Sequence, residues 1–329
     1  MNKEKKELLF NTIIAQSLGD AFGYLVEFKT WEAISSIYGH DGIIYEPEKL
    51  LMVVSDDTQM NLFCLNGLKE SKQQANYKNE ELDDPTKLIY KNYLDWFDTQ
   101  FNNHKEDKQG LMSYPELYFR RAPGNTCLSA LGSKRMGTIK NPINDSKGCG
   151  GIMRVMPIAF YATNIEEAFS WGANQAAITH GHPCGYLSAG VYAAISYELI
   201  NNTSNLIEAT KKAEKILDNY KNSDEMKNIM NKTLWNIRDS IGLQHNSLTE
   251  ELGLGWVGEE ALAISLYCAC TSSTFKEVIE KSSNHSGDSD STAMLATGLW
   301  YLANRDDSFI KDASCLDVNN LLIDYFKKI

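Results

Sequence analysis

The residues of this chain best suited to chemistry are aspartates that lie in two turns far apart in the sequence. Asp288 and Asp290 lie in the stretch 285–293, just before an apolar, small-residue run that ends at 303. Because they are two residues apart, their carboxylates can point to the same side of a turn. One capping residue is enough to begin a helix, and two buried acids are costly unless positive charge lies between them. The stretch therefore predicts more than a helix start.

A second turn of the same kind lies at 51–65. An apolar approach is followed by Ser55, Asp56, Asp57 and Thr58, and then by an apolar helix. Adjacent residues diverge on a formed helix, so we expect the two aspartates to face one point only in the non-helical residues before that helix. A capped helix is the alternative interpretation of either turn alone. The repeated pattern favours a shared function for the two turns.

Four aspartates brought close together need positive charge, because their mutual repulsion is otherwise prohibitive. The two turns contain no lysine or arginine. Carboxylate oxygens, together with the hydroxyls of Ser55 and Ser291, suit Mg²⁺ or Mn²⁺ better than zinc. Two such ions, roughly 3.5–4 Å apart, would neutralise the cluster and could clamp a substrate oxygen and a water. The sequence therefore predicts a binuclear metal site.

A glycine-rich loop at 145–151 is a second candidate binding feature. It places Ser146 and Lys147 beside three glycines in four residues. Amides in such a loop can approach a ligand closely, and at the start of a helix they suit a phosphate. The Walker A spacing is absent. A simple turn is the alternative interpretation.

Two further groups of polar residues interrupt apolar patterns. Asp20 lies within the apolar pattern of 7–22, and Glu27 follows that stretch closely; either acid alone is compatible with a structural role. His180, His182 and Cys184 could suggest zinc, but no second ligand cluster has zinc spacing. We therefore expect 179–184 to form a corner between two helices.

The elements that must position these residues are predicted to be helices. Only seven prolines occur in 329 residues, which favours helices over strands and turns. Residues 69–87 are polar and are predicted to form a surface loop, whereas 201–238 carry apolar residues at helical spacing and are predicted to form peripheral helices. There is no internal repeat and no linker that would split the chain. We expect one all-α domain over 1–329, with helices that include 7–22, 88–97, 165–178, 185–199 and the runs beginning near 261 and 293.

Composition limits the function further. Thirty-two lysines and arginines against 43 aspartates and glutamates give a net charge of −11, which argues against a protein that binds the nucleic-acid backbone. Seven cysteines without a repeated CxxC spacing suit a reducing compartment, so we expect a cytoplasmic protein. The first residues do not have the pattern of a signal peptide, and no stretch approaches the 18 apolar residues of a membrane span.

Taken in order, these motifs resemble those of the ADP-ribosylglycohydrolases, the family of the dinitrogenase-reductase-activating glycohydrolase. The resemblance runs from about residue 8 to 303 and rests on the motifs at 19–27, 55–58, 146–154, 179–180 and 287–291. It implies an all-α fold with a binuclear Mg²⁺ or Mn²⁺ centre at helix N-termini. It also implies hydrolysis of the glycosidic bond that joins ADP-ribose to an acceptor, with ADP-ribosyl-arginine protein as the first expectation.

The resemblance implies roles for individual residues. The metal shell would be Ser55, Asp56, Asp57, Asp288, Asp290 and Ser291. Glu27, Asp56, Asp57 and Asp290 would be the catalytic candidates, one of which activates water or assists the leaving group. The substrate would be bound by Ser146, Lys147, Gly148 and Gly150 at the diphosphate, His180 near the ribose and Trp256 at the adenosine side. Ser291 stands where many members have threonine, and Lys147 replaces an aromatic residue of some relatives.

Two other functions stay open at this point. One is a di-metal nucleotide phosphohydrolase; the other is an immunity protein that binds ADP-ribose or blocks an ADP-ribosyltransferase without turnover. The intact set of six metal-shell residues counts against loss of activity. Expected partners are an ADP-ribosylated protein or small molecule and the product ADP-ribose, and a cognate transferase is a further partner that the resemblance allows. No membrane is expected, and nucleic acid only as a modified substrate.

Overall fold

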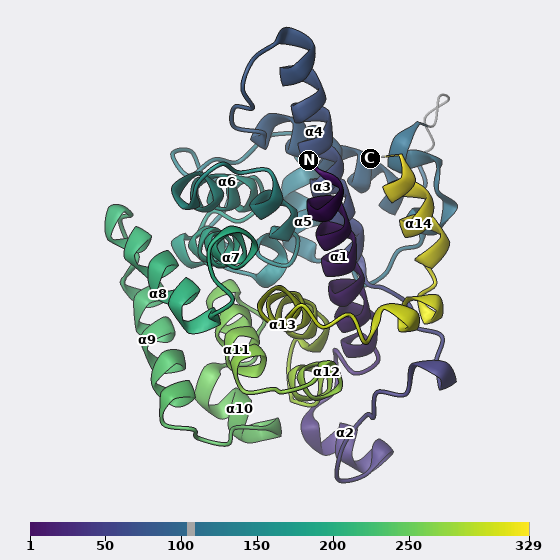
Figure 1. Cartoon of the computed structure of the whole chain (residues 1–329), viewed down its shortest axis with the longest axis vertical. Coiled ribbons are helices and arrows are strands. Elements are labelled where there is room, and N and C mark those ends of the chain that lie inside the picture. Colours follow the sequence, from purple (N-terminus) through teal and green to yellow (C-terminus); the bar gives the residue numbers. More distant parts are fainter. Residues whose placement is uncertain (104–108, 329) are drawn as a thin grey trace.

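The helix α13 (Ser289–Asn304) lies at the centre of the molecule, against α1 (Lys3–Gly23), α11 (Gly258–Cys270) and α12 (Phe275–Ser283) (Figure 1). It is buried from Ser289 to Leu302. A helix that is apolar nearly all round is stable only when other elements cover every face. The buried position of α13 therefore agrees with its sequence.

Glycine allows α1 and α13 to pack backbone against backbone. A Cβ atom at Gly19 would lie 2.5 Å from the carbonyl oxygen of Ala293, and one at Gly23 would lie 2.2 Å from that of Ser289. Both distances are well below van der Waals contact, so a larger residue would push the helices apart. This close packing brings the end of α1 next to the first turn of α13.

The computed structural model describes residues 1–103 and 109–328. Its remaining α-helices are α2 (Trp31–Tyr38), α3 (Asp56–Lys78), α4 (Thr86–Gln100), α5 (Asn125–Gly132), α6 (Ile165–Ala177), α7 (Pro183–Asn201), α8 (Leu206–Ile216), α9 (Asp224–Arg238), α10 (His245–Leu252) and α14 (Asn319–Lys327). Short 3₁₀ turns lie at Pro47–Lys49, Gly110–Ser113, Pro115–Tyr118, Cys149–Gly151, Met156–Phe160, Leu217–Asn219 and Ile310–Cys315. The described part of the chain contains no β-strand, only isolated bridges between Met52 and Leu316 and between Gly148 and Val257.

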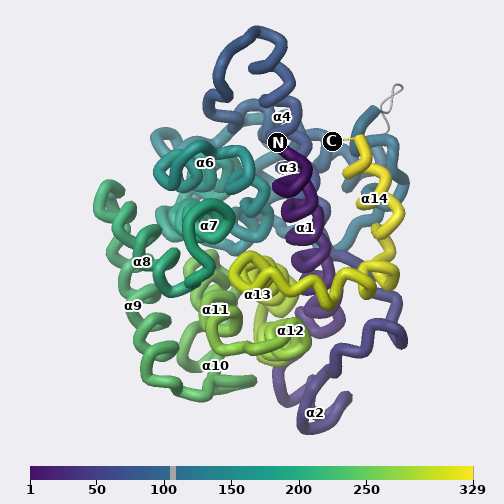
Figure 2. Tube along the Cα trace, in the orientation of Figure 1, coloured from purple at the N-terminus to yellow at the C-terminus, as the bar shows by residue number. Residues whose placement is uncertain are grey.

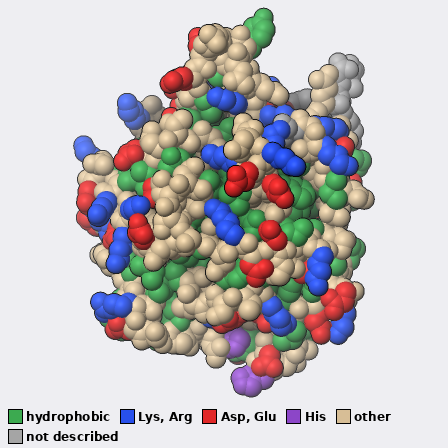
Figure 3. All heavy atoms as spheres, in the orientation of Figure 1, with side chains coloured by type: hydrophobic (Ala, Val, Ile, Leu, Met, Phe, Trp, Pro, Cys, Tyr) green, Lys and Arg blue, Asp and Glu red, His purple; other side chains and the backbone are tan. Residues whose placement is uncertain are grey.

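The other helices are arranged around this centre in pairs. α6 packs on α7, and α3 packs on α4, while α8, α9 and α10 form an outer edge (Figure 2). α14 lies on the opposite side, where the ring of Phe326 is 5.0 Å from that of Phe10 in α1. On the face shown in Figure 3, acidic and basic side chains are interspersed and form no continuous basic area.

The all-α prediction is confirmed, and most of the expected helices are present. The expected loop at 69–87 is wrong for 69–78, because α3 continues to Lys78 and buries Ser71 and Ala75. The stretch 201–238 forms the outer helices α8 and α9, as predicted. Within the described residues, no helix combines the length and the apolar character that a membrane crossing requires.

Candidate metal and substrate site

A cavity of about 540 Å³ lies where the first turns of α3 and α13 meet. Most of the predicted site residues line it: Glu27, Asp56, Asp57, Gly148, Gly150, His180, Trp256, Asp288, Asp290 and Ser291. Residues separated by more than 260 positions in the sequence are therefore brought together. The predicted residues that do not line the cavity are Ser55, Ser146 and Lys147.

The two acidic turns meet through a direct hydrogen bond. The hydroxyl of Ser291 donates to Oδ2 of Asp57 over 2.7 Å. Asp288 is the N-cap of α13, and its carboxylate accepts the Ser291 amide at 3.4 Å. The expectation that Asp56 and Asp57 precede their helix is wrong, because both lie in the first turn of α3. They nevertheless both reach the cavity, since a first turn packed against a second helix end presents more than one of its positions to the same space.

Asp20 explains how the first turn of α3 is fixed. Its carboxylate accepts the Ser55 amide at 3.0 and 3.1 Å and the Thr58 amide at 3.0 Å. Ser55, the N-cap of α3, accepts the Asp57 amide on its own hydroxyl at 3.1 Å. Amides at a helix N-terminus need acceptors, and Asp20 supplies them from α1. The buried acid that looked unusual in the sequence is thus a second cap for α3.

Glu27 points into the same acidic cluster. One oxygen each from Glu27, Asp288 and Asp290 lie within 4.8 Å of one another. Glu27 is only 7% exposed, and its Oε2 atom has no hydrogen-bond partner. A buried oxygen without a partner is rare and costly in proteins. It indicates that a group absent from the polypeptide completes this site.

The electrostatics of the cluster show the same deficit of positive charge. Burial, and then the charge of Asp290, raises the pKa of Glu27 to about 10 and the pKa of Asp20 to about 7. The pKa values of Asp56 and Asp57 are raised for the same two reasons. Among the described residues, no lysine, arginine or histidine forms an ion pair with any of these carboxylates.

The donor set therefore fits a hard divalent cation. Carboxylates and hydroxyls are the ligands that Mg²⁺ and Mn²⁺ prefer, and a cation would both neutralise the cluster and give the free oxygen of Glu27 a partner. The residues of the cavity able to hold one are Glu27, Asp56, Asp57, Asp288, Asp290 and the hydroxyl of Ser291. One sulfur lies among these oxygens, because the Cys149 thiol donates to Asp288 Oδ2 at 2.7 Å.

The glycine-rich loop forms another wall of the cavity, next to the acidic cluster. Its amides are held in place by the segment that carries Trp256, since the Cys149 amide donates to the Trp256 carbonyl at 3.1 Å and the Gly258 amide donates to the Lys147 carbonyl at 2.8 Å. A Cβ atom at Gly150 would lie 3.0 Å from Cε1 of His180 and 2.9 Å from the Cys127 sulfur. The backbone at Gly150 therefore lies so close to these side chains that a larger residue would not fit without a shift of the loop.

His180 lies beneath this loop as a neutral group. It is 1% exposed, and its Nδ1 is 2.8 Å from the Thr179 hydroxyl. Burial, and then the charge of Arg154, lowers the pKa of His180 to about 3. It can offer a hydrogen bond to a ligand but no positive charge.

Lys147 does not point into the cavity. Its ammonium group forms ion pairs with Glu225 at 2.7 Å and with Glu259 at 2.6 Å. Glu259 is 4% exposed, and Glu225 lies on the outer helix α9. Ser146 also acts within the loop, where its hydroxyl accepts the Gly148 amide at 3.3 Å. These two residues hold the loop from outside, whereas Gly148 and Gly150 face the cavity.

Two aromatic rings lie at the mouth of the cavity. Phe28 and Trp256 are 72% and 39% exposed, and their rings stack with centroids 6.0 Å apart. Sequence reasoning missed Phe28, although it directly follows Glu27. It also missed Cys149 and the wall formed by Arg120 and 122–127. The sequence does contain a pattern that could have indicated this wall. Pro123 and Gly124 lie directly before α5, just as the two acidic turns lie at the starts of α3 and α13.

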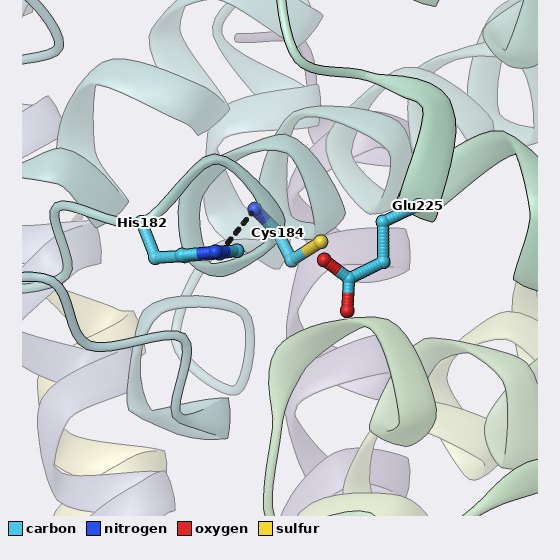
Figure 4. A group of neighbouring side chains, drawn as sticks. All are labelled: His182, Cys184 and Glu225. Carbon is cyan, nitrogen blue, oxygen red and sulfur yellow. Dashed lines mark hydrogen bonds between the residues drawn. The ribbon is translucent and has the colours of Figure 1, made fainter.

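A second polar cluster lies beside the loop and is shown in Figure 4. Ligand atoms of His182, Cys184 and Glu225 lie within 4.8 Å of one another. His180 is not part of it. The groups already have partners: Lys147 pairs with Glu225, and Nδ1 of His182 accepts the Cys184 amide at 3.1 Å as the N-cap of α7. We therefore do not propose a metal site at this cluster.

Comparison with known proteins adds the following. A family model described as ADP-ribosylglycohydrolase matches residues 1–300. A solved chain described as an ADP-ribosylglycohydrolase-related protein complex is similar in structure, with a TM-score of 0.62 and 16% sequence identity; the match covers 99% of this chain and 97% of that one. At this identity, the likeness shows the fold alone. No curated protein matches the sequence.

Proposed function

The chain belongs to the ADP-ribosylglycohydrolase family, and we propose that it is a divalent-cation-dependent hydrolase that releases ADP-ribose from an ADP-ribosylated acceptor. The observation that carries this proposal is the convergence of an acidic cluster and a glycine-rich loop on one cavity. The cluster suits cations and a ribose diol, and the loop suits a diphosphate. A ligand that spans both walls needs both chemical groups, as ADP-ribose does.

We assign separate roles in binding to the residues of the cavity. Asp56, Asp57, Asp288 and Asp290, with the hydroxyls of Ser55 and Ser291, would hold one or two Mg²⁺ or Mn²⁺ ions. Such ions, when bound, would supply the positive charge that orients a ribose diol and a water beside the anomeric carbon. The amides of 148–150 would bind the diphosphate, because backbone N–H groups can approach it without side chains between them. Phe28 and Trp256 would flank the adenosine.

Glu27 is the residue that we propose as general base. Glu27 lines the cavity beside the acidic cluster. Cation charge held there would lower its raised pKa, so that its carboxylate could accept a proton from the attacking water. The bond between the ribose C1″ atom and the acceptor would break through an oxocarbenium-like state, which surrounding carboxylates stabilise. The proton held by Glu27 would then be available to the departing acceptor.

The acceptor faces the exposed mouth, whose residues have no motif that identifies it. We propose ADP-ribosyl-arginine protein as the first substrate to test, and one domain over 1–329, since a single cluster of buried apolar residues runs from Leu9 to Tyr325. Incubation with ADP-ribosylated arginine, serine and nucleic acid, followed by mass spectrometry of the products, tests the proposal. Release of ADP-ribose and an unmodified acceptor is expected from at least one substrate. If every substrate is recovered intact in the presence of Mg²⁺ or Mn²⁺, the protein is not such a hydrolase.

A further inference from the structure

A segment near the C-terminus runs alongside the apolar approach to the first acidic turn. The Met52 amide donates to the Cys315 carbonyl at 2.9 Å, and the Asp317 amide donates to the Met52 carbonyl at 3.0 Å. Met52 and Leu316 form an isolated parallel bridge. These are the two hydrogen bonds of that bridge, so the position of 315–317 sets the path of the chain into Ser55.

One ion pair holds both polar backbone groups of Val54, the residue before Ser55. The Val54 amide donates to Oδ1 of Asp317 at 3.2 Å, and Nη1 of Arg121 donates to the Val54 carbonyl at 3.0 Å. Nη2 of Arg121 lies 2.5 Å from Oδ2 of Asp317. The Arg121 and Asp317 side chains are 11% and 15% exposed, so little solvent screens the pair.

Arg121 also holds the turn from the other side. Its backbone carbonyl accepts the Asp56 amide at 3.1 Å. The segment that follows, 122–127, lines the cavity, and its Gly124 amide donates to Oδ2 of Asp56 at 3.4 Å. Arg121 therefore links three parts: the C-terminal segment, the acidic turn and one wall of the cavity.

Stability alone does not account for such an arrangement. A largely buried ion pair adds little net stability compared with apolar residues of similar size, because both charges lose their hydration. What this pair does provide is a fixed location for the backbone at Val54, one residue before the Ser55 cap.

We propose that Arg121 and Asp317 are positioning residues for the acidic turn at 55–57, and that 315–317 supports the active site from outside the cavity although it lies beyond the family match at 1–300. The effects expected on metal affinity and on activity rest on the proposed function. Loss of the pair would let the turn move and would separate the Asp56 and Asp57 carboxylates from those of Asp288 and Asp290.

Two substitutions of Asp317 test the inference, with one control. Asp317→Ala removes both bonds, whereas Asp317→Asn keeps an acceptor for the Val54 amide and loses the charge. Asp324→Ala is the control, since Asp324 on α14 forms an exposed 2.5 Å pair with Lys328, accepts a hydrogen bond from the Tyr114 hydroxyl at 2.6 Å and does not contact 52–56. Asp317→Ala should lower Mn²⁺ affinity and kcat by roughly 10-fold, the lower end of the loss seen when a direct partner of a metal ligand is removed, because Asp317 acts on the ligands only through the backbone at Val54. The Mn²⁺ affinity and kcat of Asp317→Asn should lie between those of Asp317→Ala and the wild type. In both variants, KM should change less than kcat.

Hydrogen exchange gives a readout that does not depend on activity. Amides of 52–58 should exchange faster in Asp317→Ala and Asp317→Asn than in the wild type or Asp324→Ala, at a temperature where all four are folded. If Asp317→Ala does not fold, the comparison of Asp317→Asn with the wild type still tests the inference. Unchanged exchange at 52–58 together with wild-type Mn²⁺ affinity would overturn the inference. A wild type that neither binds Mn²⁺ nor hydrolyses any substrate would refute the proposed function, while the exchange data would still decide the positioning role.

Discussion

The hydroxyl of Ser291 donates a hydrogen bond to Asp57 Oδ2 over 2.7 Å, which joins the first turns of two helices that lie 234 residues apart in the sequence. The positive ends of both helix dipoles thus face one group of carboxylates. Each such end stabilises an acid by only about 0.3–1 kcal/mol. Burial of several carboxylates costs far more, so the helix ends alone do not balance the charge of this cluster.

A divalent cation should therefore stabilise the folded protein. A ligand that binds only the native state raises its free energy of unfolding by about 2.7 kcal/mol at 100 times Kd. We expect the melting temperature to rise with added Mg²⁺ or Mn²⁺ and to fall again in excess EDTA, with loss of activity. Thermal unfolding and hydrolysis measured across a metal titration check this. Identical melting curves and rates with EDTA and with metal would refute it.

Removal of one charge from the cluster should have opposite effects on stability and function. Asp57→Asn keeps an oxygen for the Ser291 hydroxyl but removes a carboxylate whose pKa is raised by burial and by Asp290. At pH 7 without metal, we expect a higher melting temperature, because one of several mutually repelling buried carboxylates is removed. The metal-induced rise and the activity should be lost. A variant less stable than the wild type in EDTA would contradict this interpretation.

The sequence was sufficient to find the acidic turns, because each combines residues of one chemical type with a local pattern that begins a helix. It also predicted the buried helix α13, whose apolar residues cover every face. It misjudged 69–78, where the polar side chains of α3 face solvent and only Ser71 and Ala75 are buried at helical spacing. Glutamate, lysine, glutamine and alanine all favour helix, and this signal outweighs the polarity that suggested a loop.

Long-range partners could not be predicted in the same way. Nothing local distinguishes a lysine that binds phosphate from one that pairs with acids 78 and 112 residues away, as Lys147 does. Arg121 and Asp317 are 196 positions apart, and neither lies in a recognisable pattern. Such pairs depend on how helices pack, which the periodicity of one segment does not determine.

Lys147 should accordingly matter for stability more than for ligand affinity. Lys147→Met keeps much of the side-chain volume but leaves the buried Glu259 without its ion-pair partner. We expect a lower melting temperature and an ADP-ribose affinity within about threefold of the wild type. Calorimetric titration of ADP-ribose, below the melting temperature of the variant, measures the second quantity. A large loss of affinity with normal stability would instead assign Lys147 to the diphosphate.

His180 should make the fold sensitive to acid. Its pKa is about 3 in the folded protein against an ordinary value of 6.5, so the unfolded chain binds a proton that the folded chain excludes. Between pH 6.5 and about 3, this lowers the free energy of unfolding by about 1.4 kcal/mol for each unit by which the pH falls. The difference in stability between the wild type and His180→Gln should shrink from pH 6.5 to pH 4.5. The exposed His40, changed to glutamine, is the control; a constant difference for His180→Gln would show that its ring is not held neutral.

The ligand itself separates glycohydrolase from phosphohydrolase. If the loop at 148–150 binds a diphosphate and the acidic cluster holds a ribose diol, free ADP-ribose should bind as product and inhibit. AMP lacks the second phosphate and the distal ribose, so it should bind much more weakly. Calorimetric titration of both nucleotides into metal-loaded protein, together with an assay for released phosphate, makes the comparison.

Gly150→Val is the matching substitution on the protein. Its Cβ atom would lie 2.9 Å from the Cys127 sulfur and 3.0 Å from His180 Cε1, so the loop must move and its amides lose their alignment. We expect weaker ADP-ribose binding, with the metal-induced rise in melting temperature retained because the acidic residues lie on other segments. Gly124→Ala is the control, since it lines the same cavity and a Cβ atom there meets nothing within 4 Å. Equal affinity for AMP and ADP-ribose, or phosphate released from either, would favour the phosphohydrolase.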